Sequence, residues 1–208
     1  MSVEETASDF GRLLDACRRD VAAQGELLLR YRSWLQLLAR VQIDRGLQGK
    51  LDSSDAAQQV LLEACRTFPQ FRGTTQAELT AWLRQILVHV LAHEARRYAG
   101  TQQRAIDREV SLEQQLAESS QRLASVLAAP VSSPSQQAAR HEEELRLAEV
   151  LARLPEDYRE VIVLRNLQGL SHEEVAERMG RSAGAVRMLW VRALSRLRRE
   201  LGQGSDLT

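Results

Sequence analysis

The stretch that decides the fold runs Ser171-His-Glu-Glu-Val175-Ala-Glu-Arg-Met179-Gly180-Arg-Ser182-Ala-Gly-Ala-Val186-Arg187-Met-Leu-Trp190. Its first serine and the glutamate three residues later have the spacing of a capping box, which predicts the start of a helix. Gly180 can adopt the left-handed conformation that ends a helix, and Ser182 can cap the next one. The second helix carries an apolar stripe that includes Trp190, which we expect in the core. Helix, tight glycine turn and helix are typical of a helix-turn-helix motif, whose second helix enters the major groove.

The charges around this motif are unevenly distributed. Seven arginines and no acidic residue lie from Arg178 to Arg199, whereas seven acidic residues and three arginines lie from His141 to Glu160. The whole chain hides this contrast, because Lys+Arg and Asp+Glu both total 28. The basic run predicts a phosphate-binding surface. The alternative is that these arginines only cover the solvent-exposed face of an amphipathic helix.

Composition favours a helical protein that is neither secreted nor held in a membrane. The 208 residues are 44% hydrophobic but only 4% aromatic, which suits helical cores filled by Leu and Ala. No apolar run approaches the ~18 residues of a membrane span, and the N-terminus lacks the layout of a signal peptide. Cys17 and Cys65 are too few for a disulfide framework or a zinc site, and we expect both thiols to be buried. The expected location is the cytoplasm.

The chain divides into three parts. From about residue 7 to 100 the pattern is helical: one helix should carry the apolar residues from Leu27 to Val41, another should begin at Asp52 or Ser53, and a third at Thr75 or Gln76. Residues 111–140 are rich in Ser, Gln and Pro, which predicts a flexible linker with at most a short helical stretch. Helices over 141–153 and 155–167 should precede the motif. The sequence therefore predicts an all-α fold with two small helical domains, residues 1–105 and 141–208, joined by a flexible linker over 106–140.

Both halves contain segments that resemble one family. The segment that begins Leu154-Pro-Glu-Asp-Tyr-Arg, then Gly169-Leu-Ser-His-Glu-Glu-Val-Ala and Arg192-Ala-Leu-Ser-Arg-Leu-Arg, resembles region 4 of bacterial sigma factors. Asp55-Ala-Ala-Gln58-Gln59-Val-Leu-Leu-Glu-Ala, Phe71-Arg-Gly and Ala81-Trp82-Leu-Arg-Gln-Ile86 are similar to region 2 of the same family. Because only a linker separates the two regions, the chain resembles the small extracytoplasmic-function (ECF) type. The resemblance implies a dissociable subunit that binds core RNA polymerase and directs promoter-specific transcription initiation.

The resemblance also implies which residues read the minus-35 element as duplex DNA. Arg187, in the first turns of the second motif helix, is the best candidate for a bidentate contact to guanine. The arginines that would hold phosphates are Arg181, Arg196, Arg198 and Arg199. The complete predicted minus-35 set is Arg181, Ser182, Ala185, Arg187, Met188, Arg192 and Arg196.

Region 2 of the family captures the minus-10 element as single-stranded DNA, which needs basic residues for phosphates and flat surfaces for unstacked bases. Arg104 and Arg108 could extend this basic track, whereas Trp82 lies on the apolar stripe and is expected in the core. His89 and His93 stand where family members more often have Asn and Asp; their i, i+4 spacing also suits a metal pair, but with no third ligand nearby we expect no metal. The predicted minus-10 set is Arg84, His89, His93, Arg96, Arg97 and Tyr98.

The helix similar to the polymerase-binding helix of region 2 carries a polar face around Leu62. An ordinary solvated face is the alternative interpretation of the same spacing. Gln59 stands where the family usually has an acid, so docking would rely more on hydrogen bonds. The predicted core-polymerase set is Asp55, Gln58, Gln59, Leu62 and Glu63.

Nothing in the sequence suggests catalysis or a cofactor, because no nucleophile set, glycine-rich phosphate loop or isolated acid pair is present. The expected partners are core RNA polymerase and promoter DNA, with an anti-sigma factor as a further partner that the resemblance allows. One alternative function is a free-standing helix-turn-helix regulator that binds operator DNA as a dimer. Another is a helical interaction protein that sequesters polymerase without reading DNA.

Overall fold

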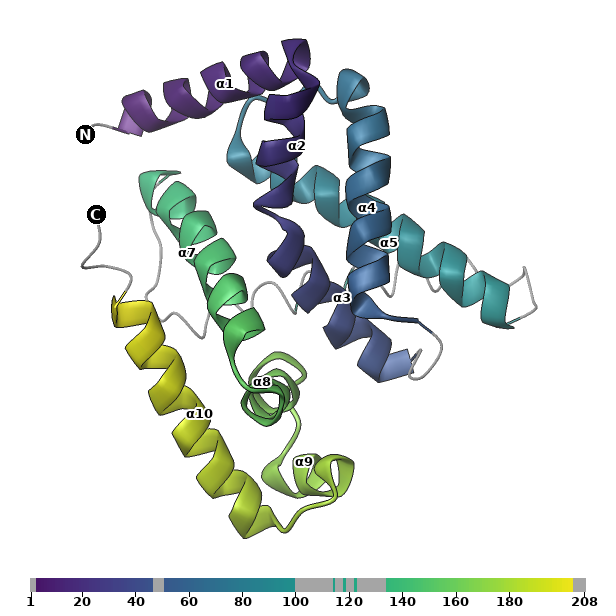
Figure 1. The fold of residues 1–208 in the computed structure, drawn as a ribbon, viewed down its shortest axis with the longest axis vertical. Helices are drawn as coiled ribbons and strands as arrows, with labels where there is room; N and C mark the ends of the chain where they lie inside the picture. Colours follow the sequence, from purple (N-terminus) through teal and green to yellow (C-terminus); the bar gives the residue numbers. More distant parts are fainter. Residues whose placement is uncertain are drawn as a thin grey trace.

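The computed structural model describes residues 3–46, 51–99, 114, 118, 122 and 134–203, and the regular elements in these ranges are all helical (Figure 1). The predicted all-α class with two helical domains is confirmed. The first half contains α1 (Val3–Arg19), α2 (Val21–Leu29), α3 (Arg32–Gly46), α4 (Ser53–Thr67) and α5 (Gln76–Ala99). The second half contains α7 (Pro134–Arg153), α8 (Glu156–Ile162), a π-helical segment η3 (Val163–Leu167), α9 (His172–Met179) and α10 (Ala183–Gln203).

Two boundaries differ from the sequence prediction. The helix α7 begins at Pro134, seven residues before the predicted start at His141, so it includes the last part of the predicted linker. Proline suits the first turn of a helix, where its missing N–H has no intrahelical partner. The expected helix over 155–167 is α-helical only to Ile162, and the π-helical η3 continues it to Leu167, where it was predicted to end. Most of the linker, with Arg104 and Arg108, lies outside the described residues, and the domain limits remain predictions.

The prediction of one helix across Leu27 to Val41 is wrong, although its apolar residues are buried as expected. The helical conformation is interrupted at Arg30 and Tyr31, between α2 and α3. The break lets the Tyr31 ring pack edge-on against Trp34, with ring centroids 6.3 Å apart. Burial raises the pKa of Tyr31 to about 12, and its hydroxyl hydrogen-bonds Gln76 of α5. Periodicity alone cannot detect this break, because the apolar stripe continues through it.

The starts of α4 and α5 are confirmed. Asp52 caps α4 by accepting a hydrogen bond from the backbone N–H of Ser54 at 2.6 Å, and α5 begins at Gln76. Glu78 lies in the first turn of α5, and its side chain accepts hydrogen bonds from the backbone N–H groups of Thr74 and Thr75, which precede the helix. Trp82, on α5, is half-buried against the rings of Phe68 and Phe71, which supports its expected role in packing.

The helix-turn-helix motif has the predicted geometry. The backbone N–H of Glu174 donates to Ser171 Oγ at 3.2 Å, while the N–H of Ser171 donates to Glu174 Oε2 at 2.7 Å, which completes the capping box of α9. Gly180 ends α9 with a φ of 62°, in the left-handed region. Ser182 Oγ then accepts from the N–H of Ala185, as a helix cap does. The local chemistry of capping and glycine therefore sets the turn.

Trp190 joins α10 to the rest of the C-terminal half but is partly exposed. Its indole N–H donates to Asn166 Oδ1 at 2.9 Å, and its ring meets His172 edge-on at 5.5 Å. The fully buried residues of the same helix face are Val186, Ala193 and Leu197. Trp190 is thus an anchor at the border of the core rather than at its centre.

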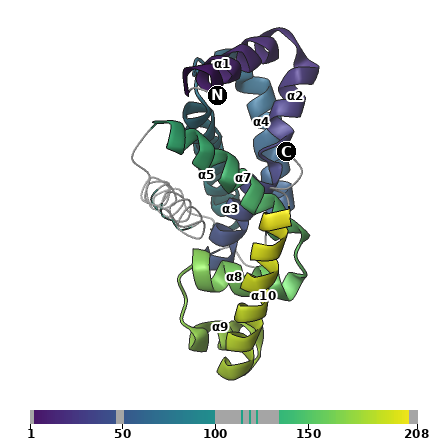
Figure 2. The ribbon, with the colours of Figure 1, turned by 90° about the vertical axis from the view of Figure 1, so that its left-hand side faces the viewer.

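The two halves share one apolar core. Its buried residues form a single continuous cluster from Leu14 to Leu197. The helix α7 lies between α3 and α10, as two views of the ribbon show (Figures 1 and 2). Leu147 and Leu151 of α7 are almost completely buried. The sequence predicted halves joined only through the linker, whereas α7 packs against both.

The two cysteines differ. Cys17 is buried, and burial raises the pKa of its thiol, whereas Cys65 on α4 is exposed, so the expectation that both are buried is wrong for Cys65. In the part of the chain described, no helix is both long and apolar enough to cross a membrane.

We predict that Trp190→Ala lowers the free energy of unfolding by about 3 kcal/mol, because it removes a large ring from the border of the core. Trp190→Phe keeps an aromatic ring but removes the hydrogen bond to Asn166, which should cost about 1 kcal/mol. Chemical denaturation of the full chain measures both values. Equal stability of the wild type and the alanine variant would contradict this role.

The capping box predicts a pH effect on α9. Hydrogen bonds from the backbone and side chain of Ser171 lower the pKa of Glu174 below its ordinary 4.5. Because its pKa is lowered in the folded chain, ionised Glu174 stabilises the start of α9. This stabilisation is complete above pH 4.5 and is lost as the pH falls through the lowered value. Hydrogen exchange at the first amides of α9 should therefore speed up in acid, beyond the intrinsic pH dependence. Glu174→Gln keeps the acceptor without the titration, so the additional acid effect should be absent in that variant.

Candidate nucleic-acid interface

The predicted minus-35 residues form one exposed surface at the start and along the outer side of α10. All seven are exposed to solvent, while Val186 on the same helix is buried. The turn at Gly180 places Arg181 and Ser182 directly before the first turn of α10. An exposed helix face with arginines at its N-terminal half and along its length suits a helix that enters the major groove.

Two arginines of this surface are held by acids of the same half. Arg187 donates to Glu173 of α9 at 2.9 Å, and Arg181 donates to Asp157 of α8 at 2.6 Å. In both ion pairs the two side chains are largely exposed. Such pairs contribute only about 0–1 kcal/mol, so phosphate or base contacts can replace them at little cost.

The same surface contains apolar side chains that can meet DNA. Met188 is 55% exposed and Val191 is 51% exposed. Side chains of this kind can contact the methyl group of thymine in the major groove. The exposure of Val191 could not be predicted from the sequence, because an apolar residue within an amphipathic helix is normally assigned to the core.

The second predicted DNA surface lies on α5. His89 and His93 are exposed, and the Nδ1 atom of His89 is 2.8 Å from the carbonyl oxygen of Gln85. Arg97 donates to both carboxylate oxygens of the buried Glu94 at 3.0 Å, and His93 Nδ1 is 3.5 Å from the same carboxylate. Arg96 is half-buried, and Tyr98 lies in the last turn of the helix. These residues share the C-terminal half of α5, whereas Arg84 does not join them.

Arg84 lies nearer the start of α5, and α7 packs against α5. The side chain is half-buried, and its burial lowers the pKa of the guanidinium, an effect that the nearby carboxylate of Glu144 on α7 opposes. A residue predicted to contact DNA is thus half-buried, near an acidic residue of the other half of the chain.

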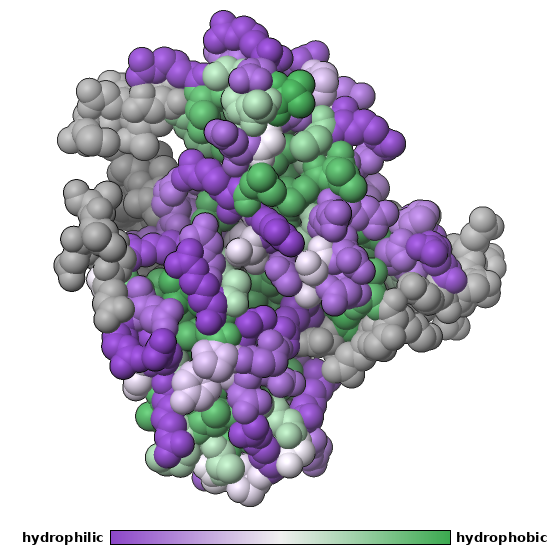
Figure 3. Space-filling model, in the orientation of Figure 1, coloured by the Kyte–Doolittle hydropathy of each residue, from purple (hydrophilic) through white to green (hydrophobic). Residues whose placement is uncertain are grey.

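The predicted polymerase-docking face lies on α4. Asp55, Gln58 and Gln59 are exposed, and Glu63 is half-buried in an ion pair with Arg66 at 2.7 Å. Leu62 in their midst is 65% exposed. Hydrophobic side chains gather on the upper part of the molecular face, over α2 and α4 (Figure 3), and the exposed apolar residues of these helices include Val21, Leu29 and Leu62. A group of exposed apolar residues with a polar rim suits a protein-binding surface.

Within the described residues, no group of three His, Cys, Asp or Glu side chains is placed to hold a metal ion. The sites that the sequence predicted therefore consist of three separate surfaces, on α4, α5 and α10, and none of them is a closed pocket for a small molecule.

Comparison with known proteins supports one family. Residues 144–197 match the family model described as sigma-70, region 4. The chain is 31% identical to the ECF RNA polymerase sigma factor SigD of Mycobacterium tuberculosis (strain ATCC 25618 / H37Rv), over 92% of this chain and 83% of that protein.

Two further relatives agree. The chain is 28% identical to the RNA polymerase sigma-H factor of Pseudomonas aeruginosa, over 85% of this chain and 84% of that protein. A shorter match covers 24% of this chain and 26% of the ECF RNA polymerase sigma factor ShbA of Streptomyces griseus, with 55% identity. The similarity to SigD extends across both helical halves, so this chain belongs to the family of ECF RNA polymerase sigma factors.

Proposed function

We propose that this chain docks on core RNA polymerase through α4, reads the minus-35 element of a promoter with α10, and captures the minus-10 element as single-stranded DNA on α5. The observation that carries the proposal is the exposed basic face of α10 behind a fully formed capping box and glycine turn. Membership of the sigma factor family supports promoter-specific initiation, rather than operator binding, as the function of these DNA contacts. The polymerase, and not this chain, performs the chemistry.

The contacts with duplex DNA would be of two kinds: specific contacts to base edges and positioning contacts to phosphates. Arg187 and Met188 lie in the first two turns of α10, where side chains reach base edges when such a helix enters the major groove. Arg192 and Arg196 lie further along, beside Arg198, where phosphates of the backbone come within reach. Binding would weaken the pair of Arg187 with Glu173, because a bidentate contact to guanine engages two of the guanidinium N–H groups and reorients the side chain.

Docking on polymerase would use the polar face of α4, with Leu62 as its apolar centre. Leu62 is 65% exposed, so its transfer from water into an interface would contribute favourable free energy to binding. Asp55, Gln58 and Gln59 around it can form hydrogen bonds at the rim of the interface.

Transcription in vitro tests the proposed function as a whole. The full chain with core polymerase should start transcripts from a subset of promoters in a genomic library, and it should act as a monomer on asymmetric bipartite sites. Because one rigid polymerase holds both DNA-reading surfaces, affinity should rise steeply in the holoenzyme. Tight binding of the chain alone to symmetric half-sites, with no transcript, would instead identify an operator-binding regulator.

Leu62→Arg should weaken binding to core polymerase at least about 30-fold, the usual effect of losing a central apolar contact. The matched control is Leu29→Arg on α2, where the leucine is 59% exposed and lies outside the proposed docking face. Fluorescence anisotropy with labelled chain measures both affinities, and equal losses in the two variants would place the docking surface elsewhere.

Arg187→Ala should weaken promoter binding of the holoenzyme by about 1–3 kcal/mol and relax the preference for one base pair of the minus-35 element. Arg198→Ala should weaken all sequences alike and lower the salt slope by about one. Binding is measured on promoter variants at several salt concentrations. Glu173→Gln, which frees Arg187, should cause no loss; a loss as large as that of Arg187→Ala would mean that the ion pair, not the DNA contact, matters.

A further inference from the structure

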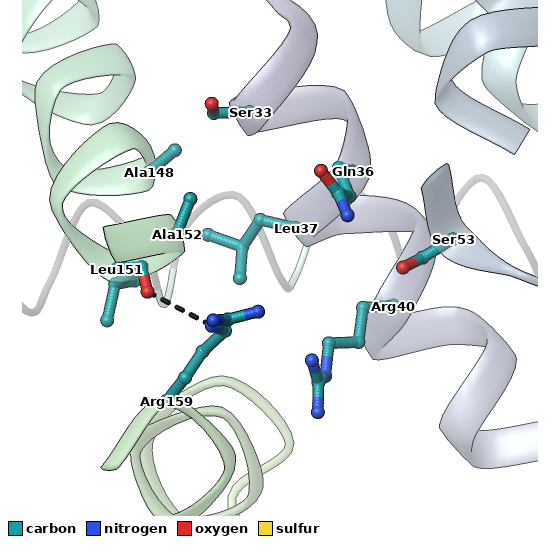
Figure 4. Close-up of a pocket in the computed structure, with 9 residues that line it drawn as sticks. All are labelled: Ser33, Gln36, Leu37, Arg40, Ser53, Ala148, Leu151, Ala152 and Arg159. Carbon is teal, nitrogen blue, oxygen red and sulfur yellow. Dashed lines mark hydrogen bonds between the residues drawn. The ribbon is translucent and has the colours of Figure 1, made fainter. Parts of the chain in front are cut away.

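A small cavity lies beside α3, between that helix and α7, and none of its lining residues belongs to the three predicted surfaces. Its volume is about 90 Å³. The two alanines Ala148 and Ala152 of α7 face Leu37 of α3 across it, and their short side chains leave this space open (Figure 4). A cavity of this volume can hold several water molecules or one anion of the size of phosphate.

Two arginines from different helices line the cavity. Arg40 of α3 and Arg159 of α8 both form ion pairs with the carboxylate of Glu156, Arg159 at 3.2 Å. Each of the two arginine side chains is only 23% exposed, so most of each is removed from water. A guanidinium group offers a planar fork of N–H donors that matches the oxygens of a phosphate. Two such groups that share one carboxylate leave this place with a surplus of positive charge.

The arginine of α8 is fixed in position, whereas the acid is replaceable. Arg159 donates to the backbone carbonyl oxygens of Leu151 at 3.1 Å and of Leu154 at 3.0 Å (Figure 4). Glu156 lies in the first turn of α8, and its side chain is 58% exposed. The carboxylate can therefore turn into water when a doubly charged anion, which attracts the arginines more strongly, takes its place.

Uncharged donors also line the cavity. Ser33 and Gln36 lie three and seven residues before their arginine on α3, a spacing that places all three side chains on one face of the helix. Ser53 is the first residue of α4, where the N-terminus of a helix carries partial positive charge. The hydroxyl and amide groups of these residues can donate hydrogen bonds to the oxygens of an anion.

We propose that this cavity binds a phosphate group, either inorganic phosphate or the phosphate of a small monoester, between Arg40 and Arg159. Ala152 is exposed, so the cavity is open to solvent there and the remainder of an ester could extend outward. The anion would replace Glu156 on the two guanidinium groups. Since it would contact α3, α4 and α8 together, its binding would stabilise their arrangement as its concentration rises. The site lies outside the surfaces of the proposed function, so the two proposals can fail independently.

Titration of the full chain with inorganic phosphate tests the proposal. Isothermal titration calorimetry at constant ionic strength, with chloride as the balancing anion, should show saturable binding of one phosphate with millimolar or tighter affinity. A parallel titration with glycerol phosphate identifies the source of the group. Tighter binding of the ester would indicate a phosphorylated small molecule, and tighter binding of inorganic phosphate would indicate the free anion.

Three variants should change the affinity in different directions. Arg40→Gln should weaken phosphate binding about tenfold or more, because it removes a charge-assisted contact. Glu156→Gln removes the competing carboxylate and should strengthen binding, by up to about fivefold. Ala152→Leu fills the cavity without a change of charge and should abolish binding. Circular dichroism verifies that each variant remains helical.

Arg66→Gln and Glu63→Gln are the matched controls. Arg66 and Glu63 form an ion pair at 2.7 Å on α4, outside the cavity, so each variant gives the same change in net charge as its counterpart and should leave the phosphate affinity unchanged.

The proposal is overturned if no saturable binding is seen at millimolar phosphate, or if Ala152→Leu binds like the wild type. It is also overturned if Glu156→Gln weakens binding as Arg40→Gln does, because the ion pair would then have only a structural role. Equal losses in Arg40→Gln and Arg66→Gln, or a loss in Arg187→Ala alone, would mean an adventitious ion only.

Discussion

Burial of α7 is the constraint on which the rest of the structure depends. Its apolar residues, with Leu147 and Leu151 at the centre, are covered by helices of both halves, namely α3, α5 and α10. An amphipathic helix that packs against two apolar partners buries more apolar surface than it would against one of them. The position of the helix-turn-helix motif relative to α5 follows from this shared helix, and so does the contact of acidic and basic side chains along its edges.

Two arginines that we propose as DNA contacts are held by weak, replaceable partners. Arg181 and Arg187 pair with exposed acids, which keeps their side chains extended without a large energetic cost when DNA displaces the acid. The paired acids also reduce nonspecific attraction to nucleic acid, because they neutralise part of the basic face. Release of these two acids would therefore increase the positive charge of the surface on α10.

Much of this structure could be predicted from local chemistry. The caps at Asp52 and Ser171 and the turn at Gly180 obey rules that depend on neighbouring residues only, and the helices begin or end there as expected. The break before α3, the π-helical turn after α8 and the packing of α7 depend on long-range contacts, such as that of Tyr31 with Gln76. The exposure of Val191 and the partial burial of Arg84 could not be predicted for the same reason, since spacing along one helix does not reveal what lies opposite.

The unequal environments of the two cysteines have a practical consequence. The thiolate is the reactive form of cysteine, and burial both hides Cys17 and raises its pKa, whereas Cys65 is open to solvent on α4. A maleimide dye should therefore attach to Cys65 in the native chain without any mutation. It would stand one turn of helix from Leu62, where its emission can report the arrival of a partner protein in real time.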